Sequence, residues 1–526
     1  MDSKVVSKIG QVSRNAAVIA VASLISRVLG LFRDRVLAGE FGAGHQLDSY
    51  YAAFRIPDLI FNLLILGALS AAFIPIFSSL VFKDEKKAWR VVNNFGNVAT
   101  ISLIAILTVV FIFAPWLVRL ITPGFSGEQL ATTIWLTRIM LLSPLFFALS
   151  SIVGGVLNVF GKFFVYSVAP IIYNIGIIIG ALYLVPRYGL EGLAYGVVIG
   201  AAGHFLVQVP SLLAVGYRFK PVFDFKDPHL KKILILMIPV TLGLGLTQIN
   251  IFVDTIIGSW LTEGSIAVIH LANNLISLPI GLVGLSFATS VFPLLSYAYN
   301  EKKSDMFALH FTKTFNFIVF LLIPLMVLSL ILRAQIVRLV LGAGLFDIID
   351  TVRTSRAFGY FALGLVAEGL LPFLARIFYA INDTKTPLKI TAVDVVVNVV
   401  ASIFFAHFLG LGVAGLALGS TIAAFVSMMC LLYALRTRFP AIDFNAMFLS
   451  AGKYIAMSTV AGLAAYGMLY FTAPLVNTLT TIGLMTQTVF AGGVGIFVYL
   501  LLSALLKVGE ADKLVALITR SKPVVK

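Results

Sequence analysis

The chain has 526 residues, of which 60% are hydrophobic and 12% are charged, and its mean hydropathy is +1.02. This composition excludes a soluble globular protein, in which roughly half of the residues are apolar and about a quarter are charged. The single cysteine, Cys430, excludes an internal disulfide and a cysteine-ligated metal site.

The apolar segments are long enough for helices of about 20 residues and do not alternate as short strands do, which predicts an all-α polytopic membrane protein. About fourteen transmembrane helices are expected. In chain order they cover residues 15–41, 47–79, 91–119, 130–157, 163–186, 190–217, 230–260, 265–298, 308–333, 355–380, 387–408, 411–435, 446–472 and 481–506. The first segment has no small-residue cleavage site, so we interpret it as a retained helix and not as a signal peptide.

The basic residues predict the orientation of the chain. If the N-terminus is cytoplasmic, alternate connections and the two ends contain most of the 38 Lys and Arg residues. The positive-inside rule then predicts that both termini are cytoplasmic. This placement accounts for the net charge of +15, so nucleic acid is not expected as a partner.

Short sequences recur at a spacing of roughly 220 residues, which indicates an internal duplication. The paired segments are Leu117–Leu120 and Ile336–Leu339, Ala72–Pro75 and Ser290–Pro293, and Asn174 with Gly192–Gly196 and Asn398 with Gly415–Gly419. Each copy contains six predicted helices, an even number, so the copies should be parallel and related by an axis along the membrane normal.

The duplication predicts two six-helix lobes. We expect an N-lobe at residues 1–220, a C-lobe at residues 221–440, and two additional helices with a cytoplasmic tail at residues 441–526. Two lobes around a central cavity favour a transporter over a channel or a membrane enzyme.

Three arginines and an aspartate lie in the first apolar segment, although a charge at the centre of the bilayer costs roughly 2.5–3.5 kcal/mol. On an ideal helix, one arc of about 120° contains Arg27, Gly30, Arg33 and Asp34. Arg35 lies outside this arc and can extend to an interface. The helix therefore has one polar face that can line a cavity.

The second predicted helix carries a similar stripe, because Asp48, Arg55 and Asn62 recur at intervals of seven and drift by only about 20° per step. One interpretation is that the arginines of both helices bind an anionic substrate, since a guanidinium is planar, permanently charged and suited to a diphosphate. The alternative is that they form internal ion pairs with Asp34 and Asp48. Asp48, near the outer end of its helix, is as suited to capping or gating as to binding the substrate.

The predicted C-lobe has a different set of polar residues. Asp254 lies in its first helix, and Asp394 and Asn398 lie four residues apart on one face of a later helix. Acids surrounded by Val and Ile are candidates for a proton or monovalent cation site, because oxygen ligands suit a hard cation. Glu368 is a weaker candidate. The alternative is that these acids are protonated or hydrogen-bonded and stabilise helix packing.

The sequence contains no nucleotide-binding loop, zinc-binding helix motif or Ser/His/Asp order, and its six histidines are scattered. We therefore expect neither an enzyme nor a resident cofactor. The energy for transport would have to come from an ion gradient or from the membrane potential.

Several motifs resemble those of the MurJ/MviN family. They are Ser26–Asp34, Phe41–Asp48, Ala52–Pro57, Gly67–Pro75, Pro123–Phe125 and Phe378–Pro387. The resemblance implies a fourteen-helix member of the multidrug/oligosaccharidyl-lipid/polysaccharide exporter superfamily. It also implies that the chain flips lipid II, the undecaprenyl-diphosphate-linked peptidoglycan precursor, across the bacterial cytoplasmic (inner) membrane.

The resemblance also implies roles for individual residues. The cavity arginines of the family's first helix match Arg27 and Arg33, and its important aspartate on the second helix matches Asp48. Together with Arg55 and Asp34, which lie on the polar faces of the two helices, the expected substrate-binding set is Arg27, Arg33, Arg55, Asp34 and Asp48.

The family's sodium site resembles the region of Asp254, Asp394 and Asn398, which implies Na⁺ as a coupling ion. Functional arginines of the family's second and eighth helices correspond here to Phe61 and Asn274. A flippase for another polyprenyl-linked glycan, or a non-transporting membrane scaffold, therefore stays open beside lipid II flipping.

The leading hypothesis is alternating access. The head group enters a central cationic cavity from the cytoplasm, while the polyprenyl tail stays in the lipid. Membrane lipids are the other expected partners, and the chain is expected to act as a monomer.

Overall fold

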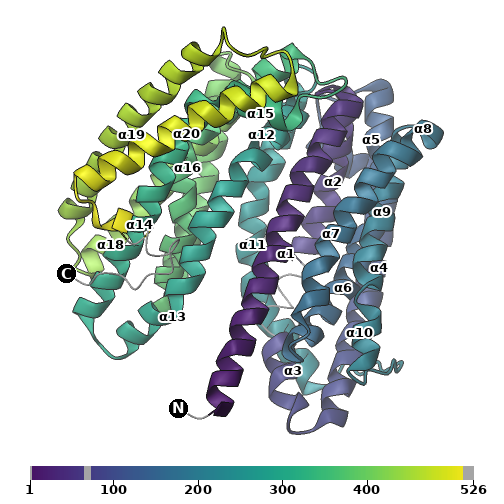
Figure 1. The fold of residues 1–526 in the computed structure, drawn as a ribbon. Helices are drawn as coiled ribbons and strands as arrows, with labels where there is room; N and C mark the ends of the chain where they lie inside the picture. The colour runs from purple at the N-terminus through teal and green to yellow at the C-terminus, as the bar shows by residue number, and fades with distance from the viewer. Residues whose placement is uncertain (1–2, 64–72, 513, 515–526) are drawn as a thin grey trace. The chain divides into compact units, whose positions relative to one another are not determined.

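The structure, a computed structural model, describes residues 3–63, 73–512 and 514. Within these residues the regular elements are helices, and no strand is present (Figure 1). The predicted all-α architecture is confirmed. Most of the motif at Gly67–Pro75 and the basic C-terminal tail lie outside the described residues.

The chain forms two compact units, of which the first extends to Ala267 and includes Ala343–Phe346. Its helices are α1 (Ser3–Phe41), α2 (His45–Phe61), α3 (Ile74–Val81), α4 (Glu85–Ile121), α5 (Gly127–Met140), α6 (Leu142–Val159), α7 (Phe163–Ile179), α8 (Val185–Tyr188), α9 (Leu190–Leu206), α10 (Val209–Ala214) and α11 (Pro228–Trp260). A π-helical turn at Gly180–Leu184 connects α7 to α8.

The second unit comprises Val268–Gly342 and the residues from Asp347 onward. Its helices are α12 (Ser265–Pro279), whose first turn belongs to the first unit, α13 (Ser286–Asn300), α14 (Ser304–Ile331), α15 (Arg333–Leu341), α16 (Ile348–Ala380), α17 (Lys385–Ile403), α18 (Val413–Arg438), α19 (Phe444–Thr472) and α20 (Thr481–Leu505). Further π-helical turns lie at Ile280–Leu285 and Phe404–Phe408. The lobe boundaries at residues 220 and 440 rest on the sequence repeat and stay a prediction.

Twelve helical segments among the described residues are long and apolar enough to span a membrane, from Glu85–Ile121 to Thr481–Leu505. Helices α1 and α2 fall outside this set. Helix α2 is only 17 residues long, and the part of α1 whose side chains are described, from Val21 onward, carries the charged stretch that includes Arg33 and Asp34. With these two helices, the described elements agree with about fourteen predicted spans.

Aspartate caps fix where several helices begin. The carboxylate of Asp84 accepts a hydrogen bond from the amide of Lys87 at the start of α4, and that of Asp227 accepts one from His229 at the start of α11. Such caps satisfy amides that have no partner inside the helix, and each stabilises the helix by about 1 kcal/mol.

In the first unit, α7 packs against α9 through glycines. A Cβ atom on Gly176 would lie 2.3 Å from Cα of Gly200, and one on Gly180 would lie 2.7 Å from Cα of Gly196. Residues without a side chain permit this approach, which is how many membrane helices associate. Helix α1 also packs against α7 (Figure 1), so the pair positions the charged face of α1.

The helix pair α17 and α18 of the second unit resembles the pair α7 and α9 of the first unit, because in each pair a glycine of the second helix packs against a π-helical turn. A Cβ atom on Gly192, in α9, would lie 2.4 Å from the carbonyl carbon of Leu184 in the preceding π-helical turn. A Cβ atom on Gly415, in α18, would lie 2.5 Å from the amide nitrogen of Ala406, again in the preceding π-helical turn. A positive-φ glycine precedes the second helix of each pair, at Gly189 and Gly412. These features recur in the same order and agree with the inferred duplication.

Candidate functional site

The charged face of α1 is attached to α7 through Arg33. This side chain donates from Nε and Nη2 to Oδ1 of Asp34, at 3.0 and 2.7 Å, and from Nη1 to Oδ1 of Asn174, at 3.1 Å. The Asp34 side chain is 2% exposed, whereas 19% of the Arg33 side chain is exposed. Asp34 balances the guanidinium charge, which lowers the cost of burying it. The exposed part of Arg33 is thus held in one orientation by two partners.

Asn174 is oriented by its own helix. Its Nδ2 donates to the carbonyl oxygen of Pro170 at 3.0 Å, one turn earlier, and this bond leaves the amide oxygen to accept from Arg33. Asn174 is part of the sequence repeat, but its partner Arg33 lies 141 residues away in the chain. Spacing along one helix could not have revealed this contact.

Three tyrosines lie near this ion pair. Tyr50 and Tyr51 of α2 and Tyr173 of α7 are within electrostatic range of Arg33. Tyr50 and Tyr51 are buried, with ring centroids 5.3 Å apart. A phenol can donate a hydrogen bond to a phosphate or sugar oxygen. Helices α1, α2 and α7 therefore bring cationic and hydroxyl donors to one region of the first unit.

A second arginine of this unit, Arg55, links α2 to α11. Its Nε donates to Oγ1 of Thr255 at 2.9 Å, and Asp58 and Asp254 are its acidic electrostatic neighbours. Oδ1 of Asp254 is buried and has no hydrogen-bond partner among the described residues. Sequence analysis missed Asp58, although its position three residues after Arg55 places both on one helical face.

Asp48 caps the first turn of α12. Its Oδ2 accepts from the amide of Gly264 and its Oδ1 from the amide of Ala267, both at 2.7 Å. In return, Oε1 of Glu263 accepts from the amide of His45 at 3.1 Å and lies 2.8 Å from its Nδ1. The Asp48 carboxylate thus stabilises the positive end of a helix dipole. These contacts favour capping over direct substrate binding.

Three other residues named from the sequence, Arg27, Phe61 and Asn274, have different surroundings. Arg27 is half-buried on α1. Phe61, the last residue of α2, packs against Phe147 with a centroid distance of 5.4 Å, so an apolar contact stands at the position that the sequence resemblance matches to an arginine. In the second unit, Nδ2 of Asn274 lies 3.1 Å from Nε2 of His270.

The second unit has an acidic set of residues around α17. Oδ1 of Asp394 accepts from Oγ of Ser427 at 2.8 Å, and Nδ2 of Asn398 donates to Oγ of Ser420 at 3.0 Å. Oδ1 of Asn398 is buried without a partner, and Glu368 of α16 is an electrostatic neighbour of Asp394. Two neighbouring acids and an unpartnered amide oxygen fit a proton or a hard monovalent cation.

The predicted cation ligands are divided between the two units. Asp254 lies in the first unit beside Arg55, and Asp394 and Asn398 lie in the second. In the part of the chain that the structure describes, no group of three or more His, Cys, Asp or Glu side chains is arranged to hold a metal ion. Any cation bound near Asp394 would therefore also depend on amide and hydroxyl oxygens.

Comparison with known proteins gives the family. A family model described as lipid II flippase MurJ matches residues 37–485. The chain belongs to the lipid II flippase MurJ family. A MurJ relative from Vibrio cholerae, named probable lipid II flippase MurJ, is 33% identical over 432 residues, which cover 80% of this chain and 82% of the relative. A relative of the same name from Rickettsia prowazekii is 33% identical over 437 residues, 81% of this chain and 84% of the relative.

Solved structures agree with the MurJ assignment. A lipid II flippase MurJ in an inward closed conformation matches with a TM-score of 0.77 at 28% identity, over 93% of this chain and 98% of that chain. An inward-facing MATE-family transporter matches with a TM-score of 0.67 at 17% identity, over 81% and 98%, a likeness of fold alone. The chain is thus a multi-pass inner-membrane protein of a flippase family, which is a class of transporters and not of catalytic enzymes.

Proposed function

We propose that this MurJ-family chain flips lipid II from the inner to the outer leaflet of the bacterial cytoplasmic membrane, with both termini in the cytoplasm. The observation that carries the proposal is Arg33, a partly exposed guanidinium in a helix among membrane spans, fixed by Asp34 and Asn174. Charge in such a helix is costly and marks a functional site by default. The relatives named lipid II flippases support the choice of substrate.

The substrate diphosphate would be bound by the donors of the first unit. A guanidinium presents parallel N–H groups that match two phosphate oxygens. Because Asp34 holds Arg33 through one oxygen, the approach of a diphosphate exchanges one anionic partner for another without leaving the cation unpaired. Arg27 and Arg55 supply further positive charge, and the undecaprenyl tail stays in the membrane lipid.

The head group would enter from the cytoplasm and leave on the outer side by alternating access, with the chain acting as a monomer. We assign Asp48 a positioning role, since it joins the start of α2 to the first turn of α12. The neighbouring contact between Glu263 and His45 joins the same two segments. Hydrogen bonds of this kind can break and re-form as one end of the pathway opens.

Cation binding would reset the empty carrier. Glu368, Asp394 and Asn398 supply carboxylate and amide oxygens for Na⁺ in the second unit. Asp254 can couple substrate binding to cation binding within the first unit, because Arg55 balances its charge. A diphosphate that attracts Arg55 would leave Asp254 available to a cation.

Growth rescue tests the lipid II assignment. The host's own lipid II flippase is depleted, and this chain is expressed at a level verified by membrane fractionation. Restored growth is expected for the wild type and for the control Arg35→Ala, and loss of rescue is expected for Arg33→Ala. Failure of the wild-type chain despite membrane insertion would refute lipid II as the substrate.

A flippase for another polyprenyl-linked glycan is the second candidate, and the contact between Phe61 and Phe147 favours it. An apolar contact in place of an arginine lowers the number of cations available to a diphosphate. Reconstituted vesicles that contain either lipid II or a different polyprenyl-diphosphate glycan distinguish the two. Movement of the second lipid alone would support this candidate, and movement of neither would support the non-transporting scaffold.

A further inference from the structure

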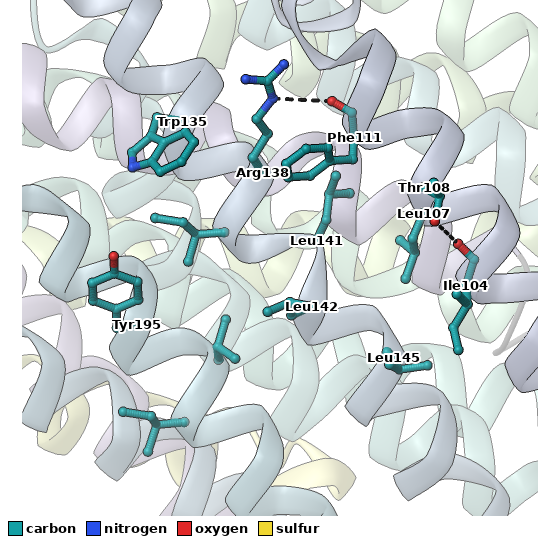
Figure 2. A pocket seen from close by; sticks show the side chains of 13 residues that line it. Ile104, Leu107, Thr108, Phe111, Trp135, Arg138, Leu141, Leu142, Leu145 and Tyr195 are labelled. Atoms are coloured by element: carbon teal, nitrogen blue, oxygen red, sulfur yellow. Dashed lines mark hydrogen bonds between the residues drawn. The ribbon is translucent and has the colours of Figure 1, made fainter.

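A groove in the first unit lies apart from the site described above. It has a volume of about 790 Å³ and lies between α4, α5, α6 and α9 (Figure 2). Nearly all of its lining side chains are hydrophobic, and the exceptions include Thr108, Tyr195 and one charged residue, Arg138. An arginine in the wall of an apolar groove between membrane helices needs a physical explanation.

A gap in the hydrogen bonding of α4 holds Arg138 in place. In a regular helix the carbonyl oxygen of Phe111 would accept from the amide of residue 115, but that residue is Pro115, which has no N–H. Nε of Arg138 donates to this carbonyl at 3.2 Å, and the guanidinium carbon lies 5.0 Å from the centroid of the Phe111 ring. Pro115 thus creates the acceptor that orients the arginine.

The rest of the guanidinium is available to a ligand. Nη1 and Nη2 of Arg138 have no partner among the described residues, since the contacts of this side chain are those with Phe111. Figure 2 shows the guanidinium pointing away from Leu142 and Leu145, which lie farther along the groove. The charged end and the apolar length of the groove are therefore separated, as they are in an amphiphile.

Arg138 stands on a helix that continues into α6 as one candidate membrane span, Gly127–Val159. It lies near the end of α5, about 16.5 Å along the helix from Gly127, at 1.5 Å per residue. A long arginine side chain can extend several ångströms toward the head groups. Trp135 and Tyr195 also line the groove, and these two residue types are enriched at the level of lipid head groups.

We propose that this groove binds one anionic phospholipid, with its phosphate on Nη1 and Nη2 of Arg138 and an acyl chain along Leu142, Leu145 and Ile199. The planar fork of arginine matches two phosphate oxygens. The groove falls within the range of roughly 300–1,000 Å³ that small-molecule sites occupy. This lipid is a bound partner and not the transported substrate, so the proposal does not rest on the flipping activity.

Native mass spectrometry of the full chain tests the proposal. The protein is released from nanodiscs that contain equal amounts of phosphatidylglycerol and phosphatidylcholine, and the lipids retained are counted. The wild type should retain phosphatidylglycerol preferentially. Arg138→Gln should lower this preference by about fivefold, the effect of one basic residue near a membrane surface. The matched control is Arg119→Gln, an exposed arginine in the last turn of α4 outside the groove, which should leave the preference unchanged.

Two further variants separate the charge from the groove. Pro115→Ala restores an amide that competes for the carbonyl of Phe111, so the preference should fall although Arg138 keeps its charge. Leu142→Trp fills the groove and should lower retention of both lipids equally. If Arg138→Gln does not fold, Arg138→Lys replaces it and should show a reduced preference, because an ammonium lacks the planar fork. An unchanged preference in the Arg138 variant, or unchanged retention in Leu142→Trp, would overturn the proposal.

Discussion

The helix pairs α7–α9 and α17–α18 share a backbone plan but differ in chemistry. Each has a π-helical turn, a positive-φ glycine and a glycine packed against that turn. In the first pair Asn174 accepts a hydrogen bond from a guanidinium, whereas in the second the amide oxygen of Asn398 has no partner. Four residues before each asparagine stand Pro170 and Asp394, respectively. One backbone plan thus carries a basic side-chain contact in one unit and acidic side chains in the other.

This difference shows that one backbone plan can carry side chains of opposite charge. The glycine contacts set the distance between the two helices and leave the exposed positions free to vary. A basic copy suits a diphosphate, and an acidic copy suits a cation.

The largest effect is expected at Arg33. Arg33→Ala should lower the rate of lipid II flipping in reconstituted vesicles by about 10- to 100-fold, because bonds to a charged group are worth roughly 1.5–3 kcal/mol. Asn174→Ala removes one partner but no charge and should cause a smaller loss. Arg35→Ala, outside the polar face, is the control. Full activity of Arg33→Ala in membranes with normal protein content would remove this residue from the substrate site.

In the second copy, Asp394→Asn should change the dependence of transport on sodium. The substitution removes a carboxylate that neighbours Glu368 and the unpartnered oxygen of Asn398. The flipping rate should be measured across a series of sodium concentrations at constant ionic strength. Asn174→Ala, at the position of the first copy that matches Asn398, should leave the sodium dependence as it is. The same sodium curve for Asp394→Asn and wild type would contradict the cation site.

The shared scaffold predicts equal effects at matching glycines. Gly192→Ala and Gly415→Ala each force a methyl group into the backbone of a π-helical turn and should destabilise the protein by about 1–3 kcal/mol. Thermal unfolding of the detergent-solubilised protein measures this. Gly96→Ala and Gly493→Ala, where a Cβ atom would meet nothing within 4 Å, are the controls and should be neutral or slightly stabilising. A large loss of stability in only one of the two variants, Gly192→Ala or Gly415→Ala, would contradict the structural equivalence of the two helix pairs.

The connection between α16 and α17 has contacts that affect the response to pH. Asp383 accepts from the amides of Lys385 and Thr386 and from the Thr386 hydroxyl, and it forms an ion pair with Arg438. Burial opposes ionisation, but the bonds from Thr386 and Arg438 outweigh it and hold the pKa of Asp383 well below the ordinary carboxyl range. Because the pKa is lower in the folded state, this stabilisation is full at neutral pH and declines as pH falls below about 4.

The smallest effect is therefore expected for Asp383→Asn. At pH 7 it should lower stability by about 1 kcal/mol, the usual effect of losing one cap. The difference in stability between this variant and the wild type should be smaller at pH 3 than at pH 7. Asp305→Asn, an exposed acid in the same unit, is the control for thermal unfolding at both pH values. A difference that widens at low pH would contradict the depressed pKa.

Much of the architecture could be predicted from sequence because bilayer thickness and hydropathy act on each segment separately. The helical class and the number of spans follow from runs of apolar residues, and Arg27, Gly30, Arg33 and Asp34 share a face by helical geometry alone. Some breaks were not predicted, such as the one between α5 and α6 at Leu141. An apolar run contains no signal for a break that depends on neighbouring helices.

The candidate site depended much more on tertiary structure. Asp48 was identified as a polar residue of a helix, but its role as a cap requires the amides of Gly264 and Ala267, more than 200 residues away. No pattern in the sequence singles out Arg138, because the residues that determine its placement, Pro115 and Phe111, lie on another helix. These contacts join different helices, so no periodicity within one helix reports them.

The sequence by itself determined that this chain is a helical membrane protein with a charged first helix, and it predicted a duplicated core, because hydropathy, helical periodicity and repeats can be read from the sequence without knowledge of tertiary contacts. Only the tertiary structure decided which partner each charge has. Arg33 lies with Asp34 and Asn174, Arg55 with Thr255, and Asp48 with backbone amides. The reason is physical: a charge among membrane helices must be balanced by whichever group packing brings within hydrogen-bond distance.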